Sequence, residues 1–436
     1  MRLNGKPLGK RRSLCGTLDI YAVAGIVLLV TIFAYFLLFR FIIAELLARE
    51  TFTAAYGGVA VVIAAILLLR LGLRLSFIPI YMYSFYLAIR FAAMGSWQDL
   101  SLISFFQYFE PIAFFFIGYY LWLLGRHEMI INSFILFTAL SLLIGQANFY
   151  FGFGGTLFQG FSFELTMSGD EILRRAYSLA GYSLGTGYLA TIATALALLR
   201  PRWQKLVLMG IFLPSLLNSY SRGAAIMLLV ALCIWHLLPA HKSKLVQPFR
   251  ILVIASIASL IIVMVLQFVP RLAHTYFNRF VLGLSLDEEG NYMRLISWRY
   301  AIDVWQRSPF FGVGFGILGS TPVIRTGSGL APESMYLKVL GELGAVGLVL
   351  YVLATLLPPV RAWVRVVRPG IGLRQRRTAG AIVAIVIAML LGGVYLQNLE
   401  SDFLAALFWF LVGCLAAFAD ASIHEKGYID QRASGV

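Results

Sequence analysis

A single carboxylate, Glu333, stands where an apolar stretch begins. It lies in APESMYLKVLGELG, residues 331–344, and the run from Met335 onward has the composition of a membrane helix. A glutamate at the mouth of a cavity can act as a general base and take the proton from an attacking hydroxyl group. The structural alternative is that Pro332 opens the first turn of the helix and the helix dipole stabilises Glu333. From these residues alone, both interpretations stay open.

Arginines in other segments have the chemistry of an anion site. The planar guanidinium group makes paired hydrogen bonds to phosphate or carboxylate, and a lipid-linked diphosphate is the obvious anion at a membrane surface. The alternative for each arginine is contact with lipid headgroups or with the acidic residues 287–289. The candidates are Arg175 in EILRRAYSLAG, Arg222 in NSYSRGAA, and Arg294 and Arg299 in NYMRLISWRYAIDVWQ.

Arg222 differs from the other candidates in its surroundings. Its turn, residues 218–223, is short and lies between two apolar stretches, where an unpaired charge is costly. Lys338 and Glu342 raise the same question inside the next apolar run. Because they are spaced i, i+4 on one helix face, we predict that they neutralise each other.

The composition requires lipid as the main solvent. Hydrophobic residues make up 60% of the 436 residues, charged residues make up 13%, and the mean hydropathy is +0.84. No soluble domain could hide this much apolar surface. We predict an all-α polytopic membrane protein with about twelve transmembrane helices in one integral membrane domain, residues 1–436. The spans are 19–39, 53–69, 75–95, 101–124, 129–150, 180–199, 204–219, 224–239, 251–269, 335–357, 379–397 and 402–419.

The distribution of Lys and Arg predicts the orientation of these helices. Every short turn assigned to the inside carries positive charge, which places the N- and C-termini in the cytoplasm. Two long outer loops then remain, residues 151–179 and 270–334. The scattered basic residues form no stripe with interleaved aromatics, which argues against nucleic acid as a partner. The short inside turns leave no room for a domain that binds ATP. Function should therefore lie on the outer face.

The second outer loop, between spans 9 and 10, contains an amphipathic helical pattern. Leu295, Trp298, Ile302 and Trp305 repeat at helical spacing, so we expect a helix that lies on the membrane and ends near Ser308 and Pro309. The glycines that follow fit a GxGxxG pattern, but no strand precedes them, so we do not assign a dinucleotide site. They are better suited to a tight backbone path back toward the membrane. These glycines are Gly312, Gly314, Gly316 and Gly319.

The order of these motifs resembles the O-antigen ligase and O-antigen polymerase (Wzy-type) family. That order is an SRG turn between two spans, a large outer loop, a carboxylate or histidine, and an E.G..G pattern in the next helix. The matching residues are Ser221, Arg222 and Gly223, then Arg294, Trp298, Ala301, Trp305, Pro309, Gly312, Gly314 and Gly316, then Glu333, Ser334, Leu337, Glu342, Gly344 and Gly347.

The resemblance implies a glycosyltransferase in the bacterial inner membrane with its active site facing the periplasm. It would move a glycan from undecaprenyl diphosphate to a sugar hydroxyl group, with Glu333 as the catalytic base. Arg222, Arg294, Arg175 and Arg299 would bind the diphosphate in place of a metal, and the outer loops contain no DxD signal. No cofactor is expected. A direct single displacement would invert the anomeric configuration.

Glu333 favours one branch of this family. Ligases of the family characteristically have a histidine at this position, so the glutamate favours a polymerase of lipid-linked repeat units for O-antigen or exopolysaccharide. Ligation of the glycan to lipid A core is the second interpretation, because a carboxylate can also serve a ligase as base. A flippase or exporter of lipid-linked glycans is a third, from a different class. The partners implied are the lipid-linked oligosaccharide, membrane lipid and a chain-length regulator.

Overall fold

The structure is a computed structural model and is helical over most of its length. It describes residues 20–34, 49–72, 74–94, 99–151, 164–168, 171–175, 183–238, 289–319, 331–368, 370–395 and 401–433. The helices are α1 (Ile20–Ala34), α3 (Arg49–Leu71), α4 (Ile78–Ala93), α5 (Asp99–Phe109), α6 (Ala113–Leu123), α7 (His127–Phe151), α9 (Ser183–Ala197), α10 (Arg202–Asn218), α11 (Arg222–Leu237), α14 (Glu289–Gln306), α16 (Met335–Val367), α17 (Leu373–Gly392) and α18 (Asp402–Ala433). Short 3-10 turns, η2 (Leu75–Phe77) and η3 (Glu110–Ile112), precede α4 and α6.

The helices confirm the predicted class but not the predicted number of membrane crossings. Among the described residues, five helices are long and apolar enough to cross a membrane. They are Leu100–Leu123, His127–Phe151, Met335–Val367, Leu373–Gly392 and Phe403–Ala421. The ninth predicted span, 251–269, lies outside the described residues. The total of about twelve spans and the cytoplasmic position of the termini stay predictions.

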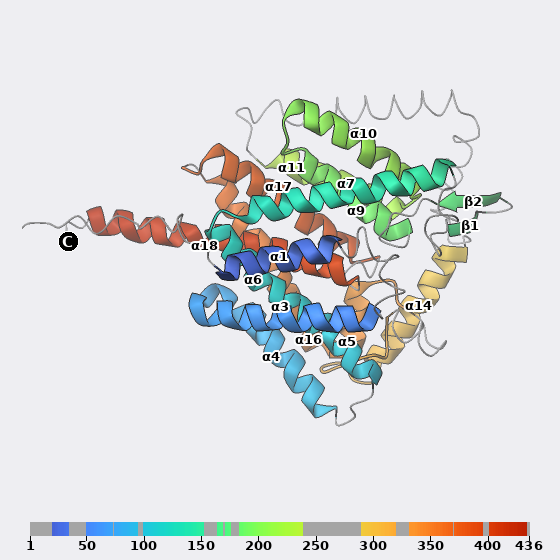
Figure 1. The fold of residues 1–436 in the computed structure, drawn as a ribbon. Helices are drawn as coiled ribbons and strands as arrows, with labels where there is room; N and C mark the ends of the chain where they lie inside the picture. The colour runs from blue at the N-terminus through green and yellow to red at the C-terminus, as the bar shows by residue number, and fades with distance from the viewer. Residues whose placement is uncertain are drawn as a thin grey trace, which may run out of the picture.

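The loop predicted at residues 151–179 contains a β-hairpin, which the all-α prediction did not include. Strands β1 (Glu164–Ser168) and β2 (Glu171–Arg175) pair antiparallel, with Glu164 opposite Arg175 and Ser168 opposite Glu171. In Figure 1 the hairpin and α14 lie on the right of the helix bundle, and α18 extends from the opposite side. The described parts of the two long predicted loops therefore lie on the same side of the helix bundle.

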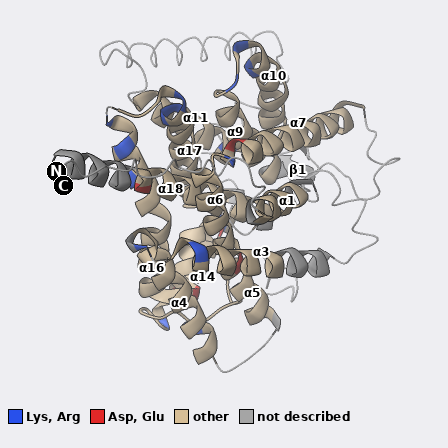
Figure 2. Cartoon of the chain, turned by 60° about the vertical axis from the view of Figure 1, so that its left-hand side comes forward, with Lys and Arg blue, Asp and Glu red and all other residues tan. Residues whose placement is uncertain are grey.

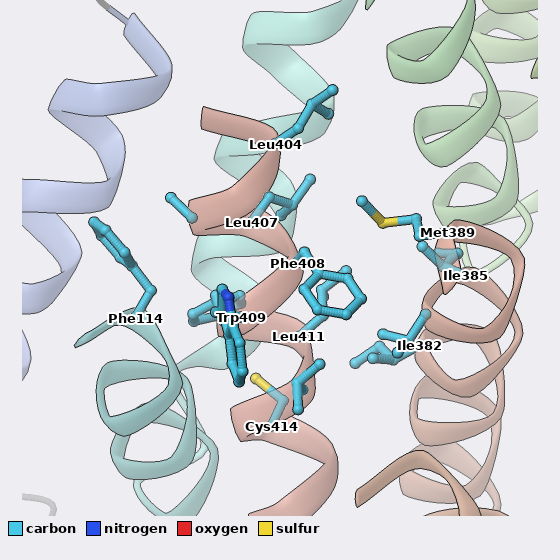
Figure 3. Close-up of a cluster of buried hydrophobic side chains, with 14 of the residues drawn as sticks. Phe114, Ile382, Ile385, Met389, Leu404, Leu407, Phe408, Trp409, Leu411 and Cys414 are labelled. Carbon is cyan, nitrogen blue, oxygen red and sulfur yellow. The ribbon is translucent and has the colours of Figure 1, made fainter. Parts of the chain in front are cut away.

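The core is centred on α18, which packs between α6 and α17. Every residue from Phe403 to Asp420 is buried. A helix that is apolar all round its circumference must be covered on all sides. Figure 3 shows how this is achieved, because Phe408 and Leu411 face Ile382, Ile385 and Met389 while Trp409 lies on the side of Phe114.

Two glycines bring the backbones of α6 and α18 into direct contact. A Cβ atom on Gly118 would lie 2.1 Å from the carbonyl oxygen of Phe410, and one on Gly413 would lie 2.0 Å from that of Phe115. Such reciprocal small residues are a common way to pack membrane helices, where lipid removes the hydrophobic drive between helices. This contact fixes α18 against α6.

Charged residues are few in the helix bundle, and uncharged residues fill most of it (Figure 2). At one helix end, the buried Asp420 accepts hydrogen bonds from Ser76 at 2.5 Å and Tyr119 at 3.0 Å and pairs with Arg361 at 2.8 Å. A buried carboxylate needs such partners because an unpaired charge would be strongly destabilising. This network joins the end of α16 to η2, α6 and α18.

The glycine contact gives a stability prediction. Gly413→Ala should lower the free energy of unfolding by about 1–3 kcal/mol, because the added methyl group would overlap the Phe115 carbonyl oxygen. The matched control is Gly210→Ala in α10, where an added Cβ meets nothing within 4 Å. That change should stabilise the helix by about 0.5–1 kcal/mol. The measurement is equilibrium unfolding in detergent. A Gly413→Ala protein at least as stable as wild type would contradict the packing described here.

Candidate active site

Glu333 lies just before helix α16 in a strained backbone conformation. The helix begins at Met335, and Ser334 is its N-cap residue, whose hydroxyl oxygen accepts a hydrogen bond from the Leu337 amide at 3.4 Å. Pro332 and Glu333 therefore precede the helix, and the expectation that they form its first turn is wrong. Glu333 has a φ of 45°, in the left-handed region that costs a non-glycine residue about 1–3 kcal/mol. Helix capping alone does not explain a glutamate held in this way.

Glu333 forms an ion pair with Arg294 of α14. The Nε and Nη2 atoms of Arg294 lie 2.9 Å and 2.8 Å from Oε2 of Glu333, and Nη1 donates to Asn291 at 3.3 Å. The side chains are 29% and 47% exposed, respectively. Two residues assigned to the site from sequence are thus in direct contact. Because a guanidinium group has five N–H donors and three are engaged here, two remain for a bound anion.

Helix α14 is held in place by a face other than the predicted one. Its buried residues are Ser297, Ala301 and Val304, and the last two form a small core with Leu318, packed against Val313 and Leu337. Of the predicted apolar residues, Leu295, Trp298 and Trp305 are only partly buried, and Ile302 is exposed. The helix itself is confirmed, and it ends at Gln306, two residues before the predicted end. Its packing against α16 and the following loop is what brings Arg294 to Glu333.

The loop after α14 is joined to a break in α16. Gly344 has a φ of 71° and a ψ of −175°, which interrupts the helix. The break releases the carbonyl groups of Gly341 and Glu342, which accept from Val313 and Gly314 at 3.0 Å each. It also releases the amides of Ala345 and Val346, which donate to the carbonyl oxygens of Pro309 at 2.9 Å and Phe310 at 3.1 Å.

Two glycines make this junction sterically feasible. A Cβ atom on Gly312 would lie 2.5 Å from the Gly344 nitrogen, and a Cβ atom on Gly344 would lie 2.5 Å from the Gly312 nitrogen. Both residues also have positive φ angles, which L-residues with a side chain rarely adopt. The expectation of a tight path for the glycine loop is confirmed. The loop and the E.G..G pattern are two halves of a single backbone junction.

Glu342 fastens the rest of the loop. Its Oε1 atom accepts from the amides of Gly316, Ile317 and Leu318 at 3.0, 3.1 and 3.0 Å, and Oε2 accepts from the Tyr108 hydroxyl at 2.8 Å. The side chain is completely buried. The predicted partner Lys338 is also buried, with its Nζ 5.1 Å from the centre of the Tyr108 ring. Spacing along one helix did not reveal that Glu342 organises a loop from another part of the chain.

The SRG turn between α10 and α11 is the second strained segment. Tyr220 has a φ of 50°, and among the described residues it and Glu333 are the only non-glycine residues with positive φ. Ser221 caps α11 by accepting from the Ala224 amide at 3.2 Å. Arg222 is therefore the first residue of α11, partly buried at the turn. Unusual backbone that the surrounding fold maintains is frequent at functional sites.

A turn that sequence reasoning missed connects these two strained segments. The carbonyl oxygen of Gly393, after α17, accepts from the Met335 amide at 2.8 Å, next to the Ser334 cap. Two residues later, the Tyr395 hydroxyl donates to the carbonyl oxygen of Gly223 at 3.0 Å. Glu333 and Arg222 thus lie at the same end of the bundle, each close to this turn. The Gly392–Gly393 pair is a turn signal, but the span predicted from hydropathy runs through residue 397.

The other two candidate arginines are not brought to Glu333 by the described contacts. Arg299 is exposed on α14. Arg175 ends strand β2, and its side chain is outside the described part of the chain. Among the described residues, no three His, Cys, Asp or Glu side chains are grouped so that they could hold a metal ion. The described site therefore consists of the Arg294–Glu333 pair and the nearby SRG turn.

Most of the residues that form this site lie in one segment of the chain that matches a known family. Residues 205–352 match the family model described as O-antigen ligase. The match confirms the resemblance to the O-antigen ligase and polymerase family. The matched region, residues 205–352, includes the SRG turn, α14, the glycine loop, Glu333 and the break in α16, and excludes Arg175 and the 393–395 turn. No curated protein matches the chain significantly.

The family match supports a broad assignment of activity. It is consistent with glycosyltransferase-type enzymes of lipopolysaccharide synthesis that act on a lipid-linked glycan in a multi-pass membrane protein. Polymerase and ligase activities are both compatible with it.

The Glu342 contacts give a prediction for the glycine loop. Glu342→Ala should leave three loop amides and the Tyr108 hydroxyl without their acceptor, at a cost of about 3 kcal/mol. Hydrogen exchange at Gly316, Ile317 and Leu318 should therefore become faster. Glu128→Ala is the control, because Glu128 pairs with Arg374 in a partly exposed position on another helix. Unchanged exchange at those three amides would show that Glu342 does not hold the loop.

Proposed function

We propose that this protein polymerises undecaprenyl-diphosphate-linked oligosaccharide repeat units at the outer face of the membrane. The observation that supports this most directly is the ion pair between Arg294 and Glu333, which joins a candidate base to an anion-binding side chain. The reaction is an inverting glycosyl transfer. Its product would be a lipid-linked O-antigen or exopolysaccharide chain.

In this mechanism Glu333 removes a proton from the acceptor. The acceptor is a sugar hydroxyl group, whose oxygen forms a bond to the anomeric carbon of the donor while its proton passes to the Glu333 carboxylate. The bond between the anomeric carbon and the diphosphate oxygen breaks, and undecaprenyl diphosphate leaves with the electron pair. Arg294 positions Glu333 through its Nε and Nη2 atoms. The side chain of Arg294 is still 29% exposed.

The arginines neutralise the departing diphosphate. The two N–H groups of Arg294 that remain free of the Glu333 and Asn291 contacts can bind a phosphate oxygen. Arg222 contributes from the SRG turn, which the Tyr395 contact holds near the start of α16. Fixed donors aimed at the developing negative charge stabilise the transition state more than the ground state. Arg299 and Arg175 are proposed as outer contacts for the same diphosphate.

Transfer to lipid A core is the second candidate function. It is favoured by the printed description of the matching family, O-antigen ligase. The chemistry at Glu333 would be the same, and only the acceptor would differ. The glutamate at position 333 favours polymerisation, since the ligases of this family that the sequence resembles place histidine there.

A reconstituted reaction distinguishes the two functions. Purified protein is incubated with lipid-linked repeat units in the presence of a chelator, with and without lipid A core. We expect dimers and longer lipid-linked chains to form without added core, because the second repeat unit supplies the acceptor hydroxyl group. Glycan transferred only to the core, with no lipid-linked dimers, would assign the protein as a ligase.

The role of Glu333 can be tested in the same assay. Glu333→Gln retains an oxygen that accepts from Arg294 but lacks a basic carboxylate, so turnover should fall by about 10²–10⁴-fold while donor binding persists. Asp303→Asn, which changes an exposed carboxylate on α14, is the matched control and should leave turnover unchanged. If Glu333→Gln turns over at close to the wild-type rate, Glu333 is not the catalytic base, and its ion pair with Arg294 is only a structural contact.

A further inference from the structure

A cavity of about 420 Å³ lies beside the glycine loop. It is formed where the end of α4 and the start of α5 meet the loop. Its lining includes Arg90, Ala93, Met94, Ser101, Phe315 and Gly316. Neither Glu333 nor Arg294 lines this cavity, so it is separate from the candidate active site.

Arg90 gives the cavity its charge. It is the only residue with a formal charge among the described residues that line it. Its Nη2 atom donates to the carbonyl oxygen of Gly312 at 3.0 Å, which fixes the guanidinium group beside the loop. A guanidinium group has five N–H donors, and the donors not engaged by Gly312 can bind an anion with several oxygen atoms.

An exposed apolar stripe on α4 leads to the cavity. Ile78, Met82, Phe85 and Ile89 follow helical spacing, and each is at least 44% exposed. One turn further along the same stripe is Ala93, which lines the cavity. A membrane helix presents such a face to hydrocarbon chains, and an arginine at its end is suited to a phosphate group at the polar boundary. The cavity and the stripe together fit a molecule with an apolar chain and an anionic head.

We propose that this cavity binds the phosphate group of a lipid, with the lipid chain along the α4 stripe. Arg90 contacts the phosphate oxygens, and the loop backbone at Phe315 and Gly316 forms the opposite wall. Because Arg90 also holds Gly312, the bound phosphate would stabilise the loop that is joined to the break in α16. Two sources share this chemistry: a membrane glycerophospholipid and a polyprenyl phosphate.

Binding of defined lipids to the full-length protein tests the proposal. Native mass spectrometry in detergent measures the affinity for phosphatidylglycerol, undecaprenyl phosphate, zwitterionic phosphatidylcholine and inorganic phosphate. Arg90→Gln removes the charge. Ala93→Trp fills the cavity without removing the contact between Arg90 and Gly312, and so separates loss of the site from loss of the fold. Arg202→Gln, an exposed arginine at the start of α10, is the control.

We expect one saturable site for an anionic lipid in the wild-type protein and in Arg202→Gln. Affinity should fall by about tenfold or more in both Arg90→Gln and Ala93→Trp, because each removes a principal feature of the site. Tighter binding of phosphatidylglycerol would identify a membrane phospholipid as the source, and tighter binding of undecaprenyl phosphate would identify the carrier lipid. Wild-type affinity in both cavity variants would overturn the proposal. Equal affinity for inorganic phosphate would overturn the part played by the α4 stripe. Because the readout is binding, the outcome is independent of glycosyl transfer.

Discussion

A buried helix break is tolerated only if every backbone group that it releases finds another partner. The break at Gly344 satisfies this requirement with a loop that arrives from the preceding segment of the chain. Carbonyl groups of α16 accept from loop amides, and amides of α16 donate to loop carbonyl groups. The Tyr86 hydroxyl donates to the carbonyl oxygen of Leu343 at 2.5 Å, which satisfies a further group at the break. Each unpaired backbone group in an apolar setting would cost roughly several kcal/mol. The loop and the broken helix are therefore stable only together.

The candidate active site depends on this junction. The loop begins where α14 ends, so fixing Pro309, Phe310 and Gly312 against α16 also fixes the position of α14. Packing of Ala301 and Val304 against Leu318 adds a second constraint. Arg294, on the first half of α14, is thereby held against Glu333 at the entrance to α16. The strain at Glu333 is sustained because the Ser334 cap and the contact with Gly393 hold the residues that follow it.

Charged groups in this protein have different roles according to their surroundings. Asp420 and Glu342 are buried and have several hydrogen-bond partners each, which suits structural carboxylates. Glu333 is nearly half exposed and has a single arginine partner on a neighbouring helix. A carboxylate that must receive a proton from a substrate requires access, whereas a carboxylate that fastens a loop requires burial. Glu333 and Glu342 therefore have different surroundings although they are close in the chain, and the exposure of Glu333 suits the role proposed for it.

The sequence alone determined the membrane class, most helix positions and the residues of interest. Apolar composition and helical spacing are local properties, so the positions of α7 and α11 and the start of α16 could be predicted closely, and the order of motifs identified Arg222, Arg294 and Glu333. The sequence also favoured a turn for the glycine loop, because repeated glycines permit positive φ angles.

Only the tertiary structure decided which of these residues meet. The pair formed by Arg294 and Glu333, the hold of Glu342 on the loop, and the link from Tyr395 to Gly223 join residues far apart in the chain. The predicted start of the span at residue 335 agrees with α16, but Pro332 and Glu333 lie before its first turn because Ser334 supplies the cap. Periodicity shows which side of a helix is apolar, but it does not show what that side packs against. The junction between the loop and the broken helix determines which face of α14 packs inward. It also determines where Arg294, Glu333 and Glu342 lie.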